Sequence, residues 1–368
     1  CSRNRLLSYE TASEAEQARA ANRLEDVRCL AEVKAAGGKR ALLVTYKPAE
    51  ERLGAIPGAD IAHFGGLRGL DRYKDHDTVI VAGREQPPPS AVEDLARSLF
   101  GDDDEPLALS GGYSLETRGY RLCDGTRRGV EVAVHPDPRC QAILEQIRER
   151  ETEQAVDRLR LVHRPRPARV LVLSNLPLDL AVDRLVTWRE LVPKRLAVAA
   201  ARLDGVLPLA PAWLAERFPD LWETAEAARH EVKRTELMGQ TPNRDSYLGF
   251  GPLTPAAYRL VGQRGPRPTR ALVRAAHPSP EAALAALVGP LAMFRREAPG
   301  GPAEPDAAPV RPSPVPVSPA SATASCARCA DPAEPGSDLC AVCGWLAGTP
   351  PPISHDVPPP RRAAGGSP

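Results

Sequence analysis

Arginine side chains gather in the segment EQAVDRLRLVHR, residues 153–164. The segment carries Gln154, Arg158, Arg160 and Arg164 directly before the apolar stretch ARVLVLSN. At these spacings the side chains would occupy neighbouring faces of one helix. A guanidinium group presents a fork of donors that matches phosphate oxygens, so one interpretation is a phosphate-binding group. The alternative is a solvated basic helix end, which the helix dipole favours.

Four of the eight cysteines form a second group with a ligand spacing. Cys326, Cys329, Cys340 and Cys343 make two CxxC pairs separated by ten residues. This pattern is typical of a tetrahedral Zn²⁺ site in a reducing compartment. We therefore expect a zinc ribbon and a cytoplasmic protein, with four unligated thiols as the alternative. Whether the ribbon binds nucleic acid or protein stays open.

Composition limits the partners that these groups could serve. The chain has 368 residues, a formal charge of +1 and 26% charged residues. Any nucleic-acid contact must therefore come from local basic patches. No apolar run approaches the ~20 residues of a membrane span, so no membrane partner is expected. The chain begins at Cys1, and its first stretch has no apolar secretion signal, so we expect that an upstream part of a longer protein is missing.

The first half of the chain has the alternating pattern of an α/β sheet that is largely parallel. The expected helices are 11–37, 90–101 and 138–162. The expected strands are 40–46, 59–64, 78–83 and 169–175, and a hairpin over 119–135 turns at Asp124-Gly125. The glycine-bearing loop GGLRGLDRYKDHD follows the second strand and would lie at the C-terminal edge of the sheet.

The second half changes to short helices, expected over 193–203, 210–219 and 221–237. Two β-like pieces, 257–261 and 269–277, then bracket the basic turn GQRGPRP. Helices followed by two strands with a basic loop between them indicate a winged-helix-like module. In this turn Arg264 and Arg267 would contact a nucleic-acid backbone, or would simply be solvated. A closing helix is expected over 281–294.

These patterns divide the chain into five parts. They are an α/β lobe over 1–182, a mainly helical module over 183–298, a disordered Pro/Ala linker over 299–325, the zinc ribbon over 326–346 and a disordered tail over 347–368. The oligomeric state is not specified by any of them.

The order of three segments carries a family resemblance. RALLVTYK, HFGGLRGLDRYKDHDTVIVAG and QAVDRLRLVHR resemble the later motifs of superfamily-two helicases, which lie on the second RecA-like lobe. They are most similar to the C-terminal part of the helicase-like ATPase in primase-helicase proteins of bacterial mobile elements. The resemblance covers roughly residues 25–180 and extends more weakly to about 297.

The resemblance implies roles for individual residues. It makes Arg158, Arg160 and Arg164 candidate arginine fingers, which stabilise charge on a transferring phosphoryl group. One departure is that Asp157 stands where the family usually has glycine, and its carboxylate could hold Arg158 in a salt bridge. The remaining implied contacts are Gln154, Gly69 and Asp71 with the nucleotide, and Thr45, Lys47 and Arg68 with the nucleic acid.

A helicase motor also needs a phosphate-cradling loop and an acidic magnesium ligand on its first lobe. Neither pattern occurs in this sequence, and AAGGKRAL lacks both the earlier glycine and the Ser/Thr. We therefore expect ATP and Mg²⁺ as cofactors only together with an upstream lobe, and DNA, expected to be single-stranded, as the partner. The alternative is a non-enzymatic nucleic-acid-binding or adaptor protein that retains a degenerate lobe and the zinc ribbon.

Overall fold

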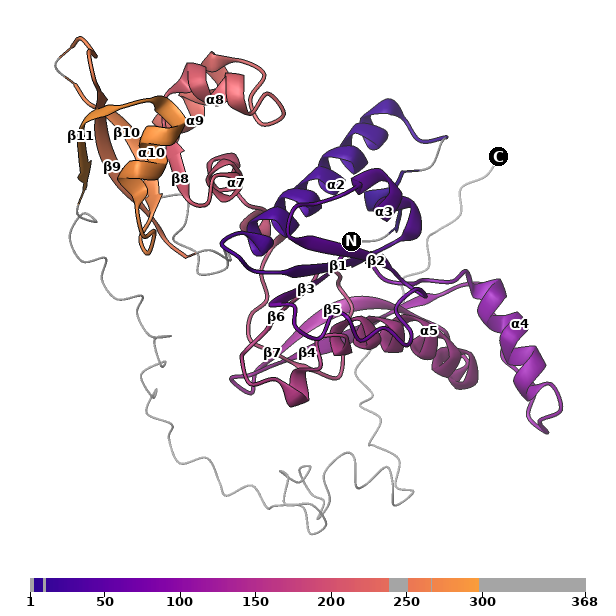
Figure 1. Ribbon diagram of the computed structural model, residues 1–368. Coiled ribbons are helices and arrows are strands. Elements are labelled where there is room, and N and C mark those ends of the chain that lie inside the picture. The colour runs from indigo at the N-terminus through magenta and orange to yellow at the C-terminus, as the bar shows by residue number, and fades with distance from the viewer. Residues whose placement is uncertain (1–2, 9–10, 238–250, 266, 298–368) are drawn as a thin grey trace, which may run out of the picture. The chain divides into compact units, whose positions relative to one another are not determined.

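Strands and helices alternate along the first half of the chain and build a mixed α/β architecture (Figure 1), which confirms the expected fold class at this level. The computed structural model describes residues 3–8, 11–237, 251–265 and 267–297. The predicted linker, zinc ribbon and tail lie outside the described residues.

A parallel sheet forms the centre of the first half, as the sequence predicts. Its strands follow the spatial order β2-β1-β3-β6 and are β1 (Ala41–Thr45), β2 (Ala59–His63), β3 (Thr78–Val81) and β6 (Arg169–Val172). In the register, Leu43 lies between Ile61 and Ile80. β1 and β3 are buried along their whole length, as apolar strands covered on both faces should be.

Helices cover both faces of this sheet. In Figure 1, α2 and α3 lie over one face and α5 lies on the other. The helices of this half are α1 (Arg3–Leu6), α2 (Glu14–Ala35), α3 (Lys47–Leu53), α4 (Pro89–Phe100) and α5 (Pro138–Asp157). α2 begins with a capping box, in which Ser13 and Glu16 each accept a hydrogen bond from the other's backbone N–H.

The predicted hairpin is also present and belongs to a second, smaller sheet. This sheet has the order β5-β4-β7, with strands β4 (Ser114–Leu122), β5 (Arg127–Val134) and β7 (Ala181–Val182). The turn is closed by a hydrogen bond from the Gly125 N–H to the Leu122 carbonyl, and Gly125 has a φ of 84°. A left-handed residue is what the predicted Asp-Gly turn supplies.

The second half folds around an antiparallel sheet in the order β11-β9-β10-β8. Its strands are β8 (Val206–Pro208), β9 (Leu253–Leu260), β10 (Thr269–Arg274) and β11 (Leu291–Arg296). Its helices are α6 (Trp188–Leu191), α7 (Arg195–Arg202), α8 (Pro211–Arg217), α9 (Ala225–Leu237) and α10 (Pro280–Val288).

The prediction of one closing helix over 281–294 is wrong in its second part. α10 ends at Val288, because Gly289 takes a φ of 100° and Pro290 follows it. Residues 291–296 instead form β11, which pairs with β9. The short strand β8 was not predicted, and its three residues pair with β10.

α2 contributes to two hydrophobic cores. Its Val27 and Leu30 pack in the core of the parallel sheet, together with Leu43 and Ile80. Val33 packs in a second core, which contains residues of α7, α8 and α9. Arg202 of α7 adds an ion pair with Glu32 of α2 at 2.9 Å. One helix therefore stabilises elements on both sides of the predicted boundary at residue 182.

Candidate functional site

The loop after β2 depends on glycines for its shape. Gly65 and Gly69 have φ values of 78° and 74°, in the left-handed region that favours glycine. Gly66 lies against the imidazole of His63, so that a Cβ at this position would lie 2.8 Å from the His63 Nε2. The His63 ring is in turn held by Glu50, whose Oε2 lies 2.6 Å from Nδ1. The backbone conformation of the loop directly after β2 is therefore tightly restricted.

The arginine segment does not continue the helix, so the prediction of a helix to residue 162 is wrong. α5 ends at Asp157, and Arg160 takes a left-handed φ of 51° before the short 3₁₀ helix η1 (Leu161–His163). The reversal directs the chain toward β6. Consequently Arg158, Arg160 and Arg164 do not share a helix face but follow one another along a turn.

The loop and the arginine segment run side by side in the same direction. Four contacts join them, and the contacts follow one another in the same order along both segments. The Gly65 N–H donates to Glu151 Oε1 (2.7 Å), and Arg158 Nη1 donates to the Leu70 carbonyl (3.2 Å). Arg160 then pairs with Asp71 (2.9 Å), and Arg164 Nη1 donates to the Lys74 carbonyl (2.6 Å). The tertiary structure thus brings together the two segments that the sequence selected separately.

Arg160 and Asp71 form the most exposed of these contacts. Their side chains are 56% and 59% exposed, and Arg160 donates through both Nε and Nη2 to Asp71 Oδ1. The hydrogen bond and charge of Arg160 lower the pKa of Asp71 below its ordinary value. Because solvent screens such a pair, it contributes little to stability and Arg160 can exchange this partner at small cost.

Two neighbouring side chains keep buried polar atoms without a partner. Within the part of the chain that the structure describes, Gln154 Oε1 and Arg158 Nε are buried and make no hydrogen bond. Arg158 uses Nη1 for the Leu70 carbonyl, and no ion pair with Asp157 occurs among the described residues. Asp157 is exposed at the end of α5. The salt bridge by which Asp157 could hold Arg158 is therefore not formed.

Thr45 and Lys47 are placed apart from this contact surface. Thr45 is fully buried, and its hydroxyl donates to the Ala82 carbonyl at 2.9 Å, whereas Lys47 is exposed at the start of α3. Between them, Tyr46 fills the space between the ends of β1 and β3. Its hydroxyl donates to the Arg84 carbonyl at 2.7 Å. Its ring lies so close to Gly83 that a Cβ at position 83 would be 2.6 Å from the ring, so only glycine fits there.

The switch point between neighbouring parallel strands is where α/β sheets commonly bind ligands. β1 and β3 meet at such a point, because the chain leaves β1 toward β2 on one side and places β3 on the other. Here the Tyr46 ring, whose residue is 5% exposed, occupies that position.

The basic turn of the second half connects β9 and β10. Arg264 and Arg267 are exposed in this turn. The register places Arg270 of β10 and Arg295 of β11 on either side of Ala257, so that both side chains share one face of the sheet. Arg270 forms an ion pair with Glu297 at 3.2 Å. Arg295 was not predicted, because β11 was not: residues 281–294 directly before Arg295 were interpreted as a helix.

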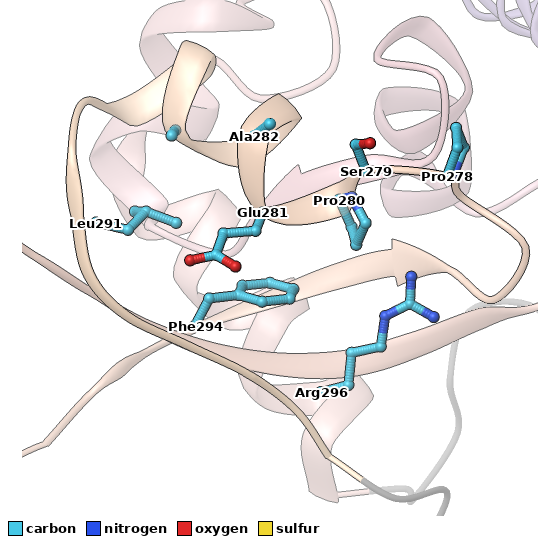
Figure 2. A pocket seen from close by; sticks show the side chains of 9 residues that line it. Pro278, Ser279, Pro280, Glu281, Ala282, Leu291, Phe294 and Arg296 are labelled. Atoms are coloured by element: carbon cyan, nitrogen blue, oxygen red, sulfur yellow. The ribbon is translucent and has the colours of Figure 1, made fainter.

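A pocket in the described residues lies elsewhere, between α10 and β11 (Figure 2). Its volume is about 580 Å³, and its walls include Pro280, Leu291 and Phe294, with Glu281 and Arg296 as charged groups. Arg296 donates to the carbonyls of Ala275 and His277. None of the predicted site residues lines this pocket.

The metal prediction falls outside the described residues, since Cys326, Cys329, Cys340 and Cys343 all lie there. Among the residues that are described, no group of three or more His, Cys, Asp or Glu side chains could hold a metal ion. A search of the same residues for a helix long and apolar enough to cross a membrane finds none.

Comparison of the chain with protein-family models, with curated proteins and with solved structures finds no match.

Proposed function

We propose that this chain is the C-terminal part of a DNA helicase or helicase-like ATPase. In this proposal the parallel-sheet half is a second RecA-like lobe, and it supplies arginines to a nucleotide held by an upstream lobe. The observation that supports it is the ordered contact between residues 151–164 and residues 65–74. Nucleotide hydrolysis coupled to nucleic-acid movement needs such a link between two functional segments.

The proposal assigns different tasks to the three arginines. Arg160 is the preferred finger, because its guanidinium is half exposed and its resting partner Asp71 is a screened surface carboxylate. Arg164 donates to the Lys74 and Leu159 carbonyls, and so it mainly shapes the turn until these bonds are exchanged. Arg158 is tied to the Leu70 carbonyl and positions the loop.

The nucleotide and its Mg²⁺ would be held by the upstream lobe. An arginine that reaches the transferring phosphoryl group stabilises the charge that develops on its oxygens. Bound ATP with Mg²⁺ would supply the phosphoryl group and its electrophilic activation. The residues of this chain would orient the closing lobe and donate hydrogen bonds from Arg160.

The second half supports the DNA part of the proposal. Three helices, α7, α8 and α9, precede β9 and β10, and the basic turn connects these strands, in the order expected of a winged-helix-like module. Arg264 and Arg267 at the turn would contact phosphates. The Zn²⁺ ribbon that we propose for the four cysteines would add a further binding surface.

One observation favours the adaptor alternative. Each of Arg158, Arg160 and Arg164 is already engaged by the loop, and Arg164 donates to backbone carbonyls. A lobe with its arginines used internally would serve as a scaffold, and the basic turn and the ribbon would then account for all binding.

ATP hydrolysis separates the two candidates. The chain, extended to include its upstream coding sequence, should hydrolyse ATP, and Arg160→Ala should reduce turnover by about 1,000-fold or more, as removal of a finger typically does. ATP binding should survive, because the phosphates are held elsewhere. Arg166→Ala is the matched control, since this exposed arginine lies two residues after Arg164 and is not among the residues that contact the loop. Equal turnover of the Arg160 and Arg166 variants would reject the finger, and an extended protein without ATPase activity would favour the adaptor.

A further inference from the structure

One buried carboxylate on α5 holds the loop after β2. The Gly65 N–H donates to Glu151 Oε1 at 2.7 Å, and Arg68 Nη2 lies 3.8 Å from Oε2. The Glu151 side chain is 9% exposed, whereas that of Arg68 is 75% exposed. The bond to Gly65 is therefore a short, charge-assisted anchor, and the attraction of Arg68 is loose.

The anchor acts on a loop that is clamped from the other side as well. Gly65 is in the left-handed region, and Gly66 lies against the imidazole of His63 on β2. The loop is thus held between His63 and Glu151. Without the carboxylate, the Gly65 N–H would lose its acceptor, and the start of the loop, which includes Arg68, would lose its contact with α5.

We infer that Glu151 is a positioning residue that fixes the start of the Gly65–Asp71 loop on α5 and thereby presents Arg68 to a nucleic-acid phosphate. The inference rests on the proposed function, in which this loop contacts the nucleic-acid backbone. Glu151 acts through the loop and touches no ligand. It would also transmit a movement of the loop to α5, and so to Arg158 and Arg160.

The charge of Glu151 and its role as a loop anchor have opposite expected effects on nucleic-acid affinity. A carboxylate near a phosphate repels it, so removal of the charge alone should tighten nucleic-acid binding. Loss of the loop anchor should weaken binding instead. Glu151→Ala removes both the charge and the anchor, whereas Glu151→Gln removes the charge and retains an oxygen that can accept from Gly65. Glu153→Ala removes a neighbouring carboxylate that pairs with Arg150 and does not contact the loop.

The experiment measures binding of a fluorescent single-stranded oligonucleotide to the chain by anisotropy over a range of salt concentrations. Glu151→Ala should bind roughly tenfold more weakly, the equivalent of one lost contact. Glu151→Gln and Glu153→Ala should bind at least as tightly as the wild type. The slope of log affinity against log salt should fall by about 1 in Glu151→Ala and in Arg68→Ala, and no further in the double variant.

Each contrary result has a defined meaning. Glu151→Ala binding as tightly as Glu153→Ala would overturn the inference and leave the proposed nucleic-acid contact intact. A wild type without salt-dependent binding would overturn both. If Glu151→Ala does not fold, Glu151→Asp takes its place, since it keeps the charge and shortens the reach; unchanged affinity of that variant would equally overturn the inference.

Discussion

Asp137 shows how a single residue prepares the helix that carries the candidate site. It is the N-cap of α5 and accepts hydrogen bonds from the N–H groups of Arg139 and Cys140, while its second oxygen accepts from the Ala108 N–H at 2.8 Å. Burial alone would raise the pKa of Asp137, but the hydrogen bonds from Ala108 and Arg139 outweigh it and lower the pKa to about 2.

Replacement of this cap should destabilise the protein in a pH-dependent way. Asp137→Ala should lower the free energy of unfolding by about 2 kcal/mol at pH 7, because three backbone N–H groups lose their acceptor. The folded pKa lies below that of an unfolded aspartate, so the stabilisation is fully present above about pH 4 and is lost as the pH falls toward 2. Urea unfolding at several pH values measures the difference.

Asp137→Asn serves as the control, since an asparagine also caps helices and should lose less stability than alanine. Equal stability of the alanine variant and the wild type at pH 7 would show that the cap is not needed. A difference between them that persists unchanged at pH 2 would contradict the assigned pKa.

At the scale of elements, α5 connects the parts of the first half. Its start is capped by Asp137, its fully buried Arg148 donates to the Ala133 carbonyl of β5 at 2.7 Å, and Glu151 anchors the loop after β2. Its C-terminal end continues into the turn that carries Arg158, Arg160 and Arg164. One helix therefore contacts the loop after β2, the hairpin sheet and the arginine segment.

The turn between β9 and β10 is the second element with a testable role. Arg264→Ala together with Arg267→Ala should weaken DNA binding at low salt and lower the salt slope by about 2, one for each lost phosphate contact. Arg189 and Arg217, exposed on α6 and α8, provide a charge-matched double control. An affinity that stays unchanged across salt concentrations would identify the turn as a solvated loop.

At the scale of the whole molecule, the two halves share α2 rather than meeting only at a linker. Val27 and Leu30 belong to one core and Val33 to the other. Substitution of Val27 or Leu30 should therefore affect the first half and substitution of Val33 the second, whereas loss of α2 as a helix should affect both. We therefore do not expect the two predicted parts to fold separately.

The four cysteines predicted to bind zinc lie outside the described residues and can be tested chemically. The purified chain should contain one Zn²⁺ per molecule, bound by four sulfurs at about 2.3 Å. Elemental analysis under reducing conditions measures the content, and Cys326→Ser with Cys343→Ser should abolish it. Cys123→Ser is the control, because Cys123 is a free, exposed cysteine elsewhere in the chain. A zinc content near zero in the wild type would refute the site.

The sequence by itself determined the local features whose signals are short in range. Apolar runs identified β1 and β3, because strands buried on both faces need continuous apolar side chains. The Asp-Gly pair identified the hairpin turn, because that turn needs a left-handed residue. Local periodicity failed at Arg160 and at Gly289, where one left-handed residue ends a pattern that otherwise looks helical.

Only the tertiary structure decided which segments meet. Glu151 was missed because its partner, the Gly65 N–H, is a backbone group 86 residues away, and no spacing in the sequence signals such a contact. The pairing of Arg160 with Asp71 likewise depends on the path of the loop between β2 and β3. Thr45 was predicted to contact nucleic acid, but it is fully buried and its hydroxyl donates to the Ala82 carbonyl of the neighbouring chain segment. Burial and hydrogen-bond partners depend on packing between segments far apart in the chain, and local sequence propensity does not contain that packing.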